Sequence, residues 1–342
     1  MKILYGVQAT GNGHITRARV MEEALAARGI SVDYIFSGRP AEKLFDMEAF
    51  GEFTVRKGLT FTVESGRIDY FKTFWQADLR TLWKDMRTLN VQDYDIVITD
   101  FEPITAWAAR WAGKPCIGLG HQYAFRFPIP KAQDSWLARQ VMRWFAPASI
   151  SFGAHWHHFG APILPPLIHV ADAPESADPD RVLVYLPFED LAQVLALIEP
   201  LENYLFDVFT DAKEPGQYGH IHIHPFGRDN FQQCLRQCES VICNAGFELA
   251  SEALHLGKRI LVKPVHGQME QASNALALKQ LGYGTAMDHL SMERIAEWLS
   301  TAPVVQVSYP DVAAAVVEWL LAGEWSKPDD LSAQLWRTVE SV

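Results

Sequence analysis

A glycine-rich turn joins an apolar run at the N-terminus to a helical pattern, and the last residue of that turn is His14. Glycines such as Gly11 and Gly13 allow the backbone to approach a ligand closely, and the following helix offers unpaired N–H groups at the positive end of its dipole. The spacing is neither GxGxxG nor a P-loop that ends in GK[ST], so it specifies no nucleotide by itself. We expect the His14 imidazole to face the ligand, and the alternative is a structural, hydrogen-bonded histidine.

A longer and more specific pattern lies in the second half of the chain. An apolar strand ends at Asn244 and Gly246, so the next helix presents its N-terminus to a ligand in a way that suits a diphosphate. Glu252 follows about two turns into that helix, where a carboxylate can accept hydrogen bonds from both hydroxyls of a ribose. After the next strand, Glu270 and Gln271 open another helix, and an acid beside an amide can bind the hydroxyls of a sugar.

A third group of residues has side chains that could bind a metal ion. It consists of His220, His222, His224, Cys234, Cys238 and Cys243. Alternation along a strand would place the histidines on one face, as some metal sites require. The cysteines form no CxxC pair, and their spacing is not that of a known zinc module. We therefore interpret the thiols as small buried hydrophobic side chains and predict no metal site.

The elements that must position these residues alternate between strand and helix in both halves. In the first half we expect strands over KILYGVQ, SVDYIFSG, DIVITD and PCIGL, and helices over 15–27, 40–51, 69–89 and 104–113. In the second half we expect strands over RVLVYLP, YLFDVFT, HIHIHPF, SVICN and RILVKP, and helices over 191–198, 230–238, 247–255 and 269–281. Apolar runs separated by helices predict parallel sheets covered on both faces. The fold class is therefore α/β, with two doubly wound domains and ligands at the carboxyl ends of the strands, in a cleft between the domains.

Length and composition agree with this architecture. A chain of 342 residues fits two domains of average size better than one. The net charge of −11 argues against nucleic acid as a main partner, because a phosphate backbone needs a surplus of Lys and Arg. The N-terminal residues lack the pattern of a secretory signal, and no apolar stretch approaches the roughly 20 residues that cross a bilayer. We therefore expect a cytoplasmic protein without a transmembrane segment.

The pattern in the second half resembles the donor-binding signature of GT-B glycosyltransferases. The resemblance rests on Gly246, Glu252, the strand within 257–264, Glu270 with Gln271, and Asn274 with Ala275. The signature is similar to that of lipid-linked muropeptide N-acetylglucosaminyltransferases and of plant and antibiotic UDP-sugar transferases in particular. The GNGH and DFEP segments are similar to an uncharacterised bacterial and archaeal subfamily, over nearly the whole chain. Two departures are Lys258-Arg259 in place of the family's proline, and LPFED at 186–190 in place of a glycine-rich loop.

The resemblance implies a role for each matching residue. Glu252 would hold the ribose, Glu270 and Gln271 would hold the transferred sugar, and the backbone near Phe226 would contact the base. A shift in composition to proline and small polar residues predicts a linker over 166–180, which divides the chain into Rossmann-like domains over 1–165 and 181–325. The resemblance implies that the first domain lies on the acceptor side and that the second binds the nucleotide sugar. Residues 326–342 would form a helix that returns to the first domain.

An inverting transfer needs a base that takes the proton of the acceptor hydroxyl. An imidazole suits this task, and a carboxylate behind it fixes the tautomer and stabilises the imidazolium. Asp100 ends the strand DIVITD and could orient His14, as an Asp at the matching position does in the plant enzymes; alternatively, Asp100 caps the helix that follows. His121 and Gln122 end the next strand, so His121 is the competing base and Gln122 an acceptor-side residue.

Aromatic and basic residues occur together in two further segments. They are Tyr70, Phe71, Lys72, Phe74, Trp75, Arg80, Trp83, Lys84 and Arg87, and then Trp136, Arg139, Arg143, Trp144 and Phe145. Such residues could bring the first domain to an anionic membrane that carries a lipid-linked acceptor. The interpretation we prefer is that the aromatic rings face the core and the charges form a solvated face.

The leading functional hypothesis is a metal-independent, inverting glycosyltransferase without a cofactor. Its donor would be a UDP-sugar, such as UDP-N-acetylglucosamine, and its acceptor a polyprenol-linked or other small hydroxyl compound. Helix N-termini and cationic side chains would stabilise the leaving diphosphate in place of a metal. The alternatives are a nucleotide-sugar 2-epimerase and a non-catalytic nucleotide-sugar-binding protein.

Overall fold

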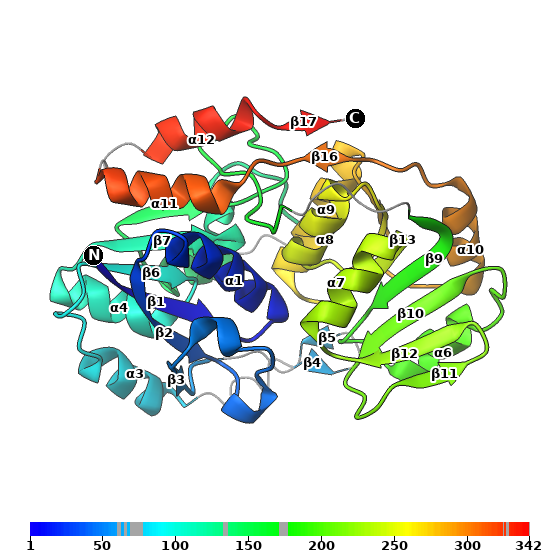
Figure 1. The fold of residues 1–342 in the computed structure, drawn as a ribbon, viewed down its shortest axis with the longest axis horizontal. Coiled ribbons are helices and arrows are strands. Elements are labelled where there is room, and N and C mark those ends of the chain that lie inside the picture. Colours follow the sequence, from blue (N-terminus) through cyan, green and yellow to red (C-terminus); the bar gives the residue numbers. More distant parts are fainter. Residues whose placement is uncertain are drawn as a thin grey trace.

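Each half of the chain is built around one larger sheet with helices on its faces (Figure 1). The computed structural model describes residues 1–59, 63–64, 67–68, 78–132, 136–170, 177–323, 325 and 328–341. The first sheet has the strand order β3-β2-β1-β6-β7-β8, and its strands pair in parallel. Its strands are β1 (Lys2–Gln8), β2 (Ser31–Ser37), β3 (Phe53–Arg56), β6 (Ile96–Asp100), β7 (Cys116–Gly120) and β8 (Ile150–Gly153). Its helices are α1 (Asn12–Ala26), α3 (Leu79–Thr88), α4 (Pro103–Ala112) and α5 (Trp136–Trp144).

The second sheet has the order β11-β12-β10-β9-β13-β14-β15, and only its edge strand β11 is antiparallel to its neighbour among the described strands. Its strands are β9 (Asp178–Tyr185), β10 (Leu205–Thr210), β11 (Gly216–Tyr218), β12 (Ile221–Pro225), β13 (Cys238–Asn244), β14 (Arg259–Lys263) and β15 (Thr285–Ala286). Its helices are α6 (Leu191–Ile198), α7 (Arg228–Gln237), α8 (Phe247–His255), α9 (Met269–Leu281) and α10 (Met292–Thr301). Short pairs join β4 (Val63–Glu64) to β5 (Arg67–Ile68), and β16 (Val307–Ser308) to β17 (Glu340–Ser341).

Continuous packing joins the two halves. One hydrophobic cluster contains residues of both sheets together with α1 and α8. Within it, the fully buried Trp156 donates from its indole nitrogen to Ser251 Oγ of α8 at 2.8 Å. Because this contact is buried and hydrogen-bonded, it fixes α8 against the first half.

The C-terminal segment crosses back to the first half. Helix α11 (Val312–Ala322) contacts α1, and Ser332 of α12 (Pro328–Trp336) donates to the Ile163 carbonyl at 2.8 Å. Figure 1 shows these two helices, in orange and red, beside the first sheet. The crossing therefore begins ahead of residue 325, where the second domain was expected to end; the exact domain boundaries stay a prediction.

Two expected helices differ in the structure. The helix expected over 40–51 is wrong: the segment forms 3-10 turns at Ala41–Lys43 and Glu48–Phe50, because Leu44 is extended and Asp46 has a φ of 51°. Of the helix expected over 69–89, the described part begins at Leu79, after Asp78 caps it by accepting from the Thr81 N–H. Residues 69–77 lie outside the described residues.

The preferred interpretation of the aromatic residues is wrong for several of them. Trp83 and Trp136 are 59% and 68% exposed, and Trp144 is also exposed. The physical reason is contact with arginine rather than with the core: Arg87 lies 5.2 Å from the Trp83 ring and Arg143 lies 5.2 Å from the Trp144 ring. Tyr70, Phe71, Lys72, Phe74 and Trp75 lie outside the described residues, and membrane contact stays a prediction. Among the described residues, no helix has the length and apolar character that a bilayer-spanning helix needs.

Candidate active site

His14 and Asp100 meet at the carboxyl ends of two neighbouring strands. His14 lies in the first turn of α1, directly after β1, and Asp100 is the last residue of β6. Because β1 and β6 pair in parallel, their ends lie side by side, and His14 Nδ1 is 2.8 Å from Asp100 Oδ1. A proton on Nδ1 donates to the fully buried carboxylate and leaves the lone pair of Nε2 free to accept another proton.

Asp100 does not cap α4, so the alternative role for this residue is wrong. Glu102 is the cap instead: its carboxylate accepts from the Ile104 N–H at 2.9 Å and from the Thr105 N–H at 2.7 Å. Phe101, between the two acids, has a φ of 51°, an unfavourable conformation for a bulky residue. This turn directs Asp100 towards His14 and Glu102 towards the helix.

Arg17 connects this pair to the second half of the chain. It lies one turn after His14 on α1 and is fully buried. Its Nε donates to Asp100 Oδ2 at 2.8 Å, its Nη2 donates to Asp100 Oδ1 at 2.6 Å, and its Nη1 donates to Glu248 Oε1. Burial alone would lower the pKa of Arg17, but the Asp100 and Glu248 carboxylates raise it above its ordinary value. Likewise, burial would raise the pKa of Asp100, but Arg17 and His14 together hold it below its ordinary value.

Sequence reasoning missed both Arg17 and Glu248. The spacing of His14 and Arg17 is i, i+3, which places both on one face of α1 and could have identified Arg17. Nothing in the sequence indicates that Glu248 would meet Arg17, because that contact depends on how the two halves pack.

His121 is held in a different way from His14. It is fully buried, with Nδ1 2.9 Å from the Ala154 carbonyl oxygen and Nε2 2.7 Å from Asn274 Oδ1. Its ring stacks on Phe247 with a centroid distance of 4.1 Å, and burial lowers its pKa. Since both ring nitrogens already contact carbonyl oxygens, the geometry favours His14 over His121 as a base.

Gln122 bridges His14 and Glu270. Its Nε2 donates to both carboxylate oxygens of Glu270 at 3.1 Å and lies 3.5 Å from His14 Nε2. Gln271 has another contact: its Oε1 accepts from the Val265 N–H at 2.8 Å and anchors the loop before α9. The structure therefore brings Glu270, but not the Gln271 amide oxygen, to the face that His14 occupies.

Several helices begin without a capping side chain. Within the part of the chain that the structure describes, no side chain caps α1, α8 or α9, whose N-cap residues are Gly11, Gly246 and Gln268. Helix α7 begins at Gly227, and its first N–H, that of Arg228, donates to Asp46 Oδ2 at 2.7 Å. In contrast, side chains cap α3, α4, α6, α10 and α11 through Asp78, Glu102, Asp190, Ser291 and Asp311. Uncapped helix N-termini can bind an anion, which favours α8 over α6 as a diphosphate site.

Asn244 and Phe226, expected near the donor, pack against neighbouring side chains. Asn244 Nδ2 donates to Glu189 Oε1 at 3.1 Å and to the Lys263 carbonyl at 3.0 Å. Phe226 lies against Tyr185, with ring centroids 5.9 Å apart. Asn244 is the last residue of β13 and Phe226 directly follows β12, so both border the strand ends at which a ligand is expected.

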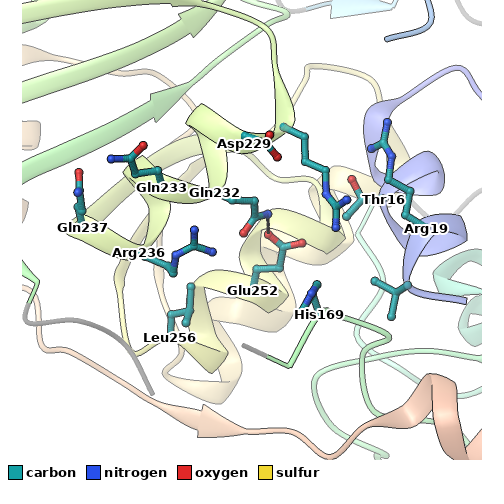
Figure 2. Close-up of a pocket in the computed structure, with 12 residues that line it drawn as sticks. Thr16, Arg19, His169, Asp229, Gln232, Gln233, Arg236, Gln237, Glu252 and Leu256 are labelled. Carbon is teal, nitrogen blue, oxygen red and sulfur yellow. Dashed lines mark hydrogen bonds between the residues drawn. The ribbon is translucent and has the colours of Figure 1, made fainter. Parts of the chain in front are cut away.

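Glu252 lines a cavity of about 570 Å³ between α1, α7 and α8 (Figure 2). Gln232 Nε2 donates to its Oε2 at 2.9 Å, and burial raises the pKa of the carboxyl above its ordinary value. The cationic side chains that line the same cavity are Arg19, Arg228 and Arg236, and His169 lies in the wall as well. A buried carboxylate among cations, in a cavity of this size, suits a nucleotide with hydroxyls and phosphates.

Two of the residues considered as metal ligands, His224 and Cys234, lie beside an ion pair between Arg181 and the buried Asp207. Among the described residues, one group, Asp207, His224 and Cys234, has metal-ligating atoms within 4.8 Å of one another. Arg181 Nε donates to Asp207 Oδ2 at 2.5 Å, and His224 Nε2 lies 2.8 Å from Asp207 Oδ1. The guanidinium thus already balances the Asp207 charge, which leaves the carboxylate a poor metal ligand.

Comparisons with known proteins identify the fold. Residues 1–303 match the family described as glycosyl transferase family 1. No curated protein matches the chain. The glycosyltransferase SsfS6 of Streptomyces sp. SF2575, complexed with thymidine diphosphate, is similar at 15% identity and a TM-score of 0.60, over 94% of this chain and 99% of that one. Arabidopsis thaliana UGT89C1, complexed with UDP, is similar at 13% identity and a TM-score of 0.59, over 98% of this chain and 99% of that one.

A third similar structure is MurG of Acinetobacter baumannii, at 16% identity and a TM-score of 0.54, over 87% of this chain and 90% of that one. At such identities the likeness shows the fold alone. The expected architecture of two Rossmann-like domains of the GT-B type is confirmed.

Replacing Arg17 with methionine should lower the free energy of unfolding by about 3–5 kcal/mol, because the buried Asp100 carboxylate would lose its cation and Glu248 would lose its hydrogen-bond donor. Urea denaturation of both proteins measures the difference. The matched control is Arg28→Met, which breaks an exposed ion pair with Glu318 and should cost about 1 kcal/mol or less. Equal losses in the two variants would show that the buried pair has no special structural role.

Proposed function

The chain belongs to glycosyl transferase family 1, and we propose that it transfers a sugar from a nucleoside-diphosphate donor, such as UDP-N-acetylglucosamine, to an acceptor hydroxyl with inversion at the anomeric carbon. The observation that carries this proposal is the combination of an uncapped α8 N-terminus with Glu252 in a cavity wall on the same helix. Membership of the family makes the chain a glycosyltransferase; the donor, the acceptor and the stereochemistry are the proposal.

The geometry of α8 supports a nucleoside diphosphate as the donor. Gly246 and Glu252 are about 9 Å apart along the helix axis at 1.5 Å per residue, so a diphosphate at the first turn and a pentose at Glu252 can belong to one ligand. Glu252 can accept hydrogen bonds from two vicinal hydroxyls, which a ribose has and a 2′-deoxyribose lacks. This chemistry favours UDP over thymidine diphosphate, although similar structures hold one or the other.

In the proposed reaction, His14 acts as the general base. Its Nε2 would take the proton of the acceptor hydroxyl as that oxygen forms a bond to the anomeric carbon, and the bond from that carbon to the diphosphate oxygen would break. Asp100 would stabilise the resulting imidazolium, and Glu270 would hold a hydroxyl of the transferred sugar beside Gln122. The free N–H groups of α8, with the cations that line the cavity, would stabilise the departing diphosphate without a metal.

Replacing Glu252 with alanine should weaken UDP binding about tenfold to a hundredfold, because hydrogen bonds from the pentose to a charged group are lost. Isothermal titration calorimetry with UDP measures the change. Glu199→Ala, at an exposed position after α6, is the control and should bind UDP as the unchanged protein does. Unaltered UDP affinity in the Glu252 variant would show that the nucleotide does not bind in this cavity.

Replacing His14 with alanine should lower turnover about 10²- to 10⁴-fold while UDP affinity stays within about twofold, because the base acts on the acceptor and not on the donor. The assay is release of UDP from UDP-N-acetylglucosamine with a panel of polyprenols and small alcohols. His289→Ala, an exposed histidine of the second half, is the control.

Two results of that assay would redirect the proposal. Equal turnover in the His14 variant and the control would show that His14 is not the base and would leave His121 as the candidate. A new nucleotide sugar formed without any acceptor would indicate a 2-epimerase instead.

A further inference from the structure

Glu248 places a buried carboxyl group between the first turns of two helices. It belongs to the first turn of α8 and is 6% exposed. A Cβ at Gly13 of α1 would come within 3.0 Å of its Cγ, so the glycine permits this close approach. Oε1 accepts from Arg17, whereas the buried Oε2 has no hydrogen-bond partner among the described residues. An unpaired buried oxygen is costly, so a partner is expected in the working protein.

The charges around Glu248 do not balance when both acids are ionised. Asp100 and Glu248 share the single guanidinium of Arg17, and these buried side chains have little contact with water. Asp100 accepts hydrogen bonds from Arg17 Nε, from Arg17 Nη2 and from His14 Nδ1, whereas Glu248 accepts from Arg17 Nη1 alone among the described residues. Asp100 is therefore the better-stabilised carboxylate, and Glu248 is the group that holds a proton.

The surroundings of Glu248 on every side support this assignment. The titratable and charged groups that interact with it are Arg17 of α1, Asp100 of β6, Tyr5 of β1 and Glu252 of α8. Burial raises the pKa of Glu248, and the positive charge of Arg17 lowers it. The negative charges of Asp100 and Glu252 raise the pKa further, to about 8. A carboxyl with that pKa is mostly protonated at neutral pH.

We propose that Glu248 is protonated when the donor binds and that its Oε2–H donates a hydrogen bond to the diphosphate. This inference rests on the proposed function, since it places a diphosphate at the first turn of α8. An ionised Glu248 in that same turn would repel the diphosphate in a medium of low dielectric constant, whereas the protonated form supplies a donor and receives its missing acceptor. At a pH above the pKa of Glu248, binding of the diphosphate is therefore accompanied by transfer of a proton from solvent to Oε2.

Arg17 stays in place during this step. Its Nε and Nη2 both donate to Asp100, so a swing of the guanidinium towards the diphosphate would leave the buried Asp100 carboxylate without a cation. Protonation of Glu248 avoids this loss because it removes the negative charge without moving a side chain.

The test is isothermal titration calorimetry of UDP binding to the full chain at pH 7, 8 and 9. At pH 7 and at pH 9 the titration is repeated in buffers of different ionisation enthalpy, which gives the number of protons taken up at each pH. The phosphates of UDP are already ionised there, since their last pKa lies near 6. We expect uptake close to zero at pH 7 and close to one proton at pH 9, with affinity about tenfold weaker at pH 9 than at pH 7.

Glu248→Gln keeps an N–H donor at the same position but cannot ionise. Its UDP affinity should be the same at pH 7 and pH 9, and it should take up no proton. Glu239→Gln is the matched control, because Glu239 is also paired with an arginine, Arg259, at 2.7 Å, and this variant should behave as the unchanged protein does. If the Glu248 variant fails to fold, the infrared difference spectrum of the unchanged protein with UDP at pH 9 replaces it, and should show a newly protonated carboxyl.

The outcomes separate this inference from the proposed function. UDP binding without proton uptake at pH 9, or a pH dependence that persists in Glu248→Gln, overturns the inference and leaves the donor site in place. Absence of UDP binding at every pH overturns the proposed function itself.

Discussion

The organisation of the site depends on one buried cation, Arg17, that lies between carboxylates of the two halves. Its guanidinium holds Asp100 at the end of β6, and Asp100 in turn orients His14. The same guanidinium contacts Glu248 in the first turn of α8. Because these charges are buried, their interaction is strong and their geometry is narrowly defined. The base and the helix proposed to hold the donor are thus connected through a single side chain.

Two consequences of parallel sheets bring the remaining groups together. The carboxyl ends of neighbouring strands lie side by side, and each strand leads into a helix whose N-terminus faces the same region. Around this region the helices α1, α8 and α9 begin at Gly11, Gly246 and Gln268, without a capping side chain among the described residues. The polar contacts across the two halves, such as Gln122 with Glu270 and His121 with Asn274, are made where these ends meet.

The sequence predicts local features well and contacts between the halves poorly. Apolar strands that alternate with helices predict the α/β class. The resemblance to the plant transferases predicts that His14 and Asp100, each near the end of a strand, lie close together. The contact of Arg17 with Glu248 depends on the packing of α1 against α8, which no local pattern encodes. The exposed Trp83 and Trp136 show a further limit, because helical spacing does not distinguish a ring in the core from one at the surface.

A crystal structure of the chain with bound UDP tests the central claim most directly. The account predicts the pentose hydroxyls within hydrogen-bonding distance of the Glu252 carboxylate and the diphosphate at the first turn of α8, beside Glu248 and the Arg17 guanidinium. A nucleotide bound away from α8, or a diphosphate at the capped N-terminus of α6, would contradict it.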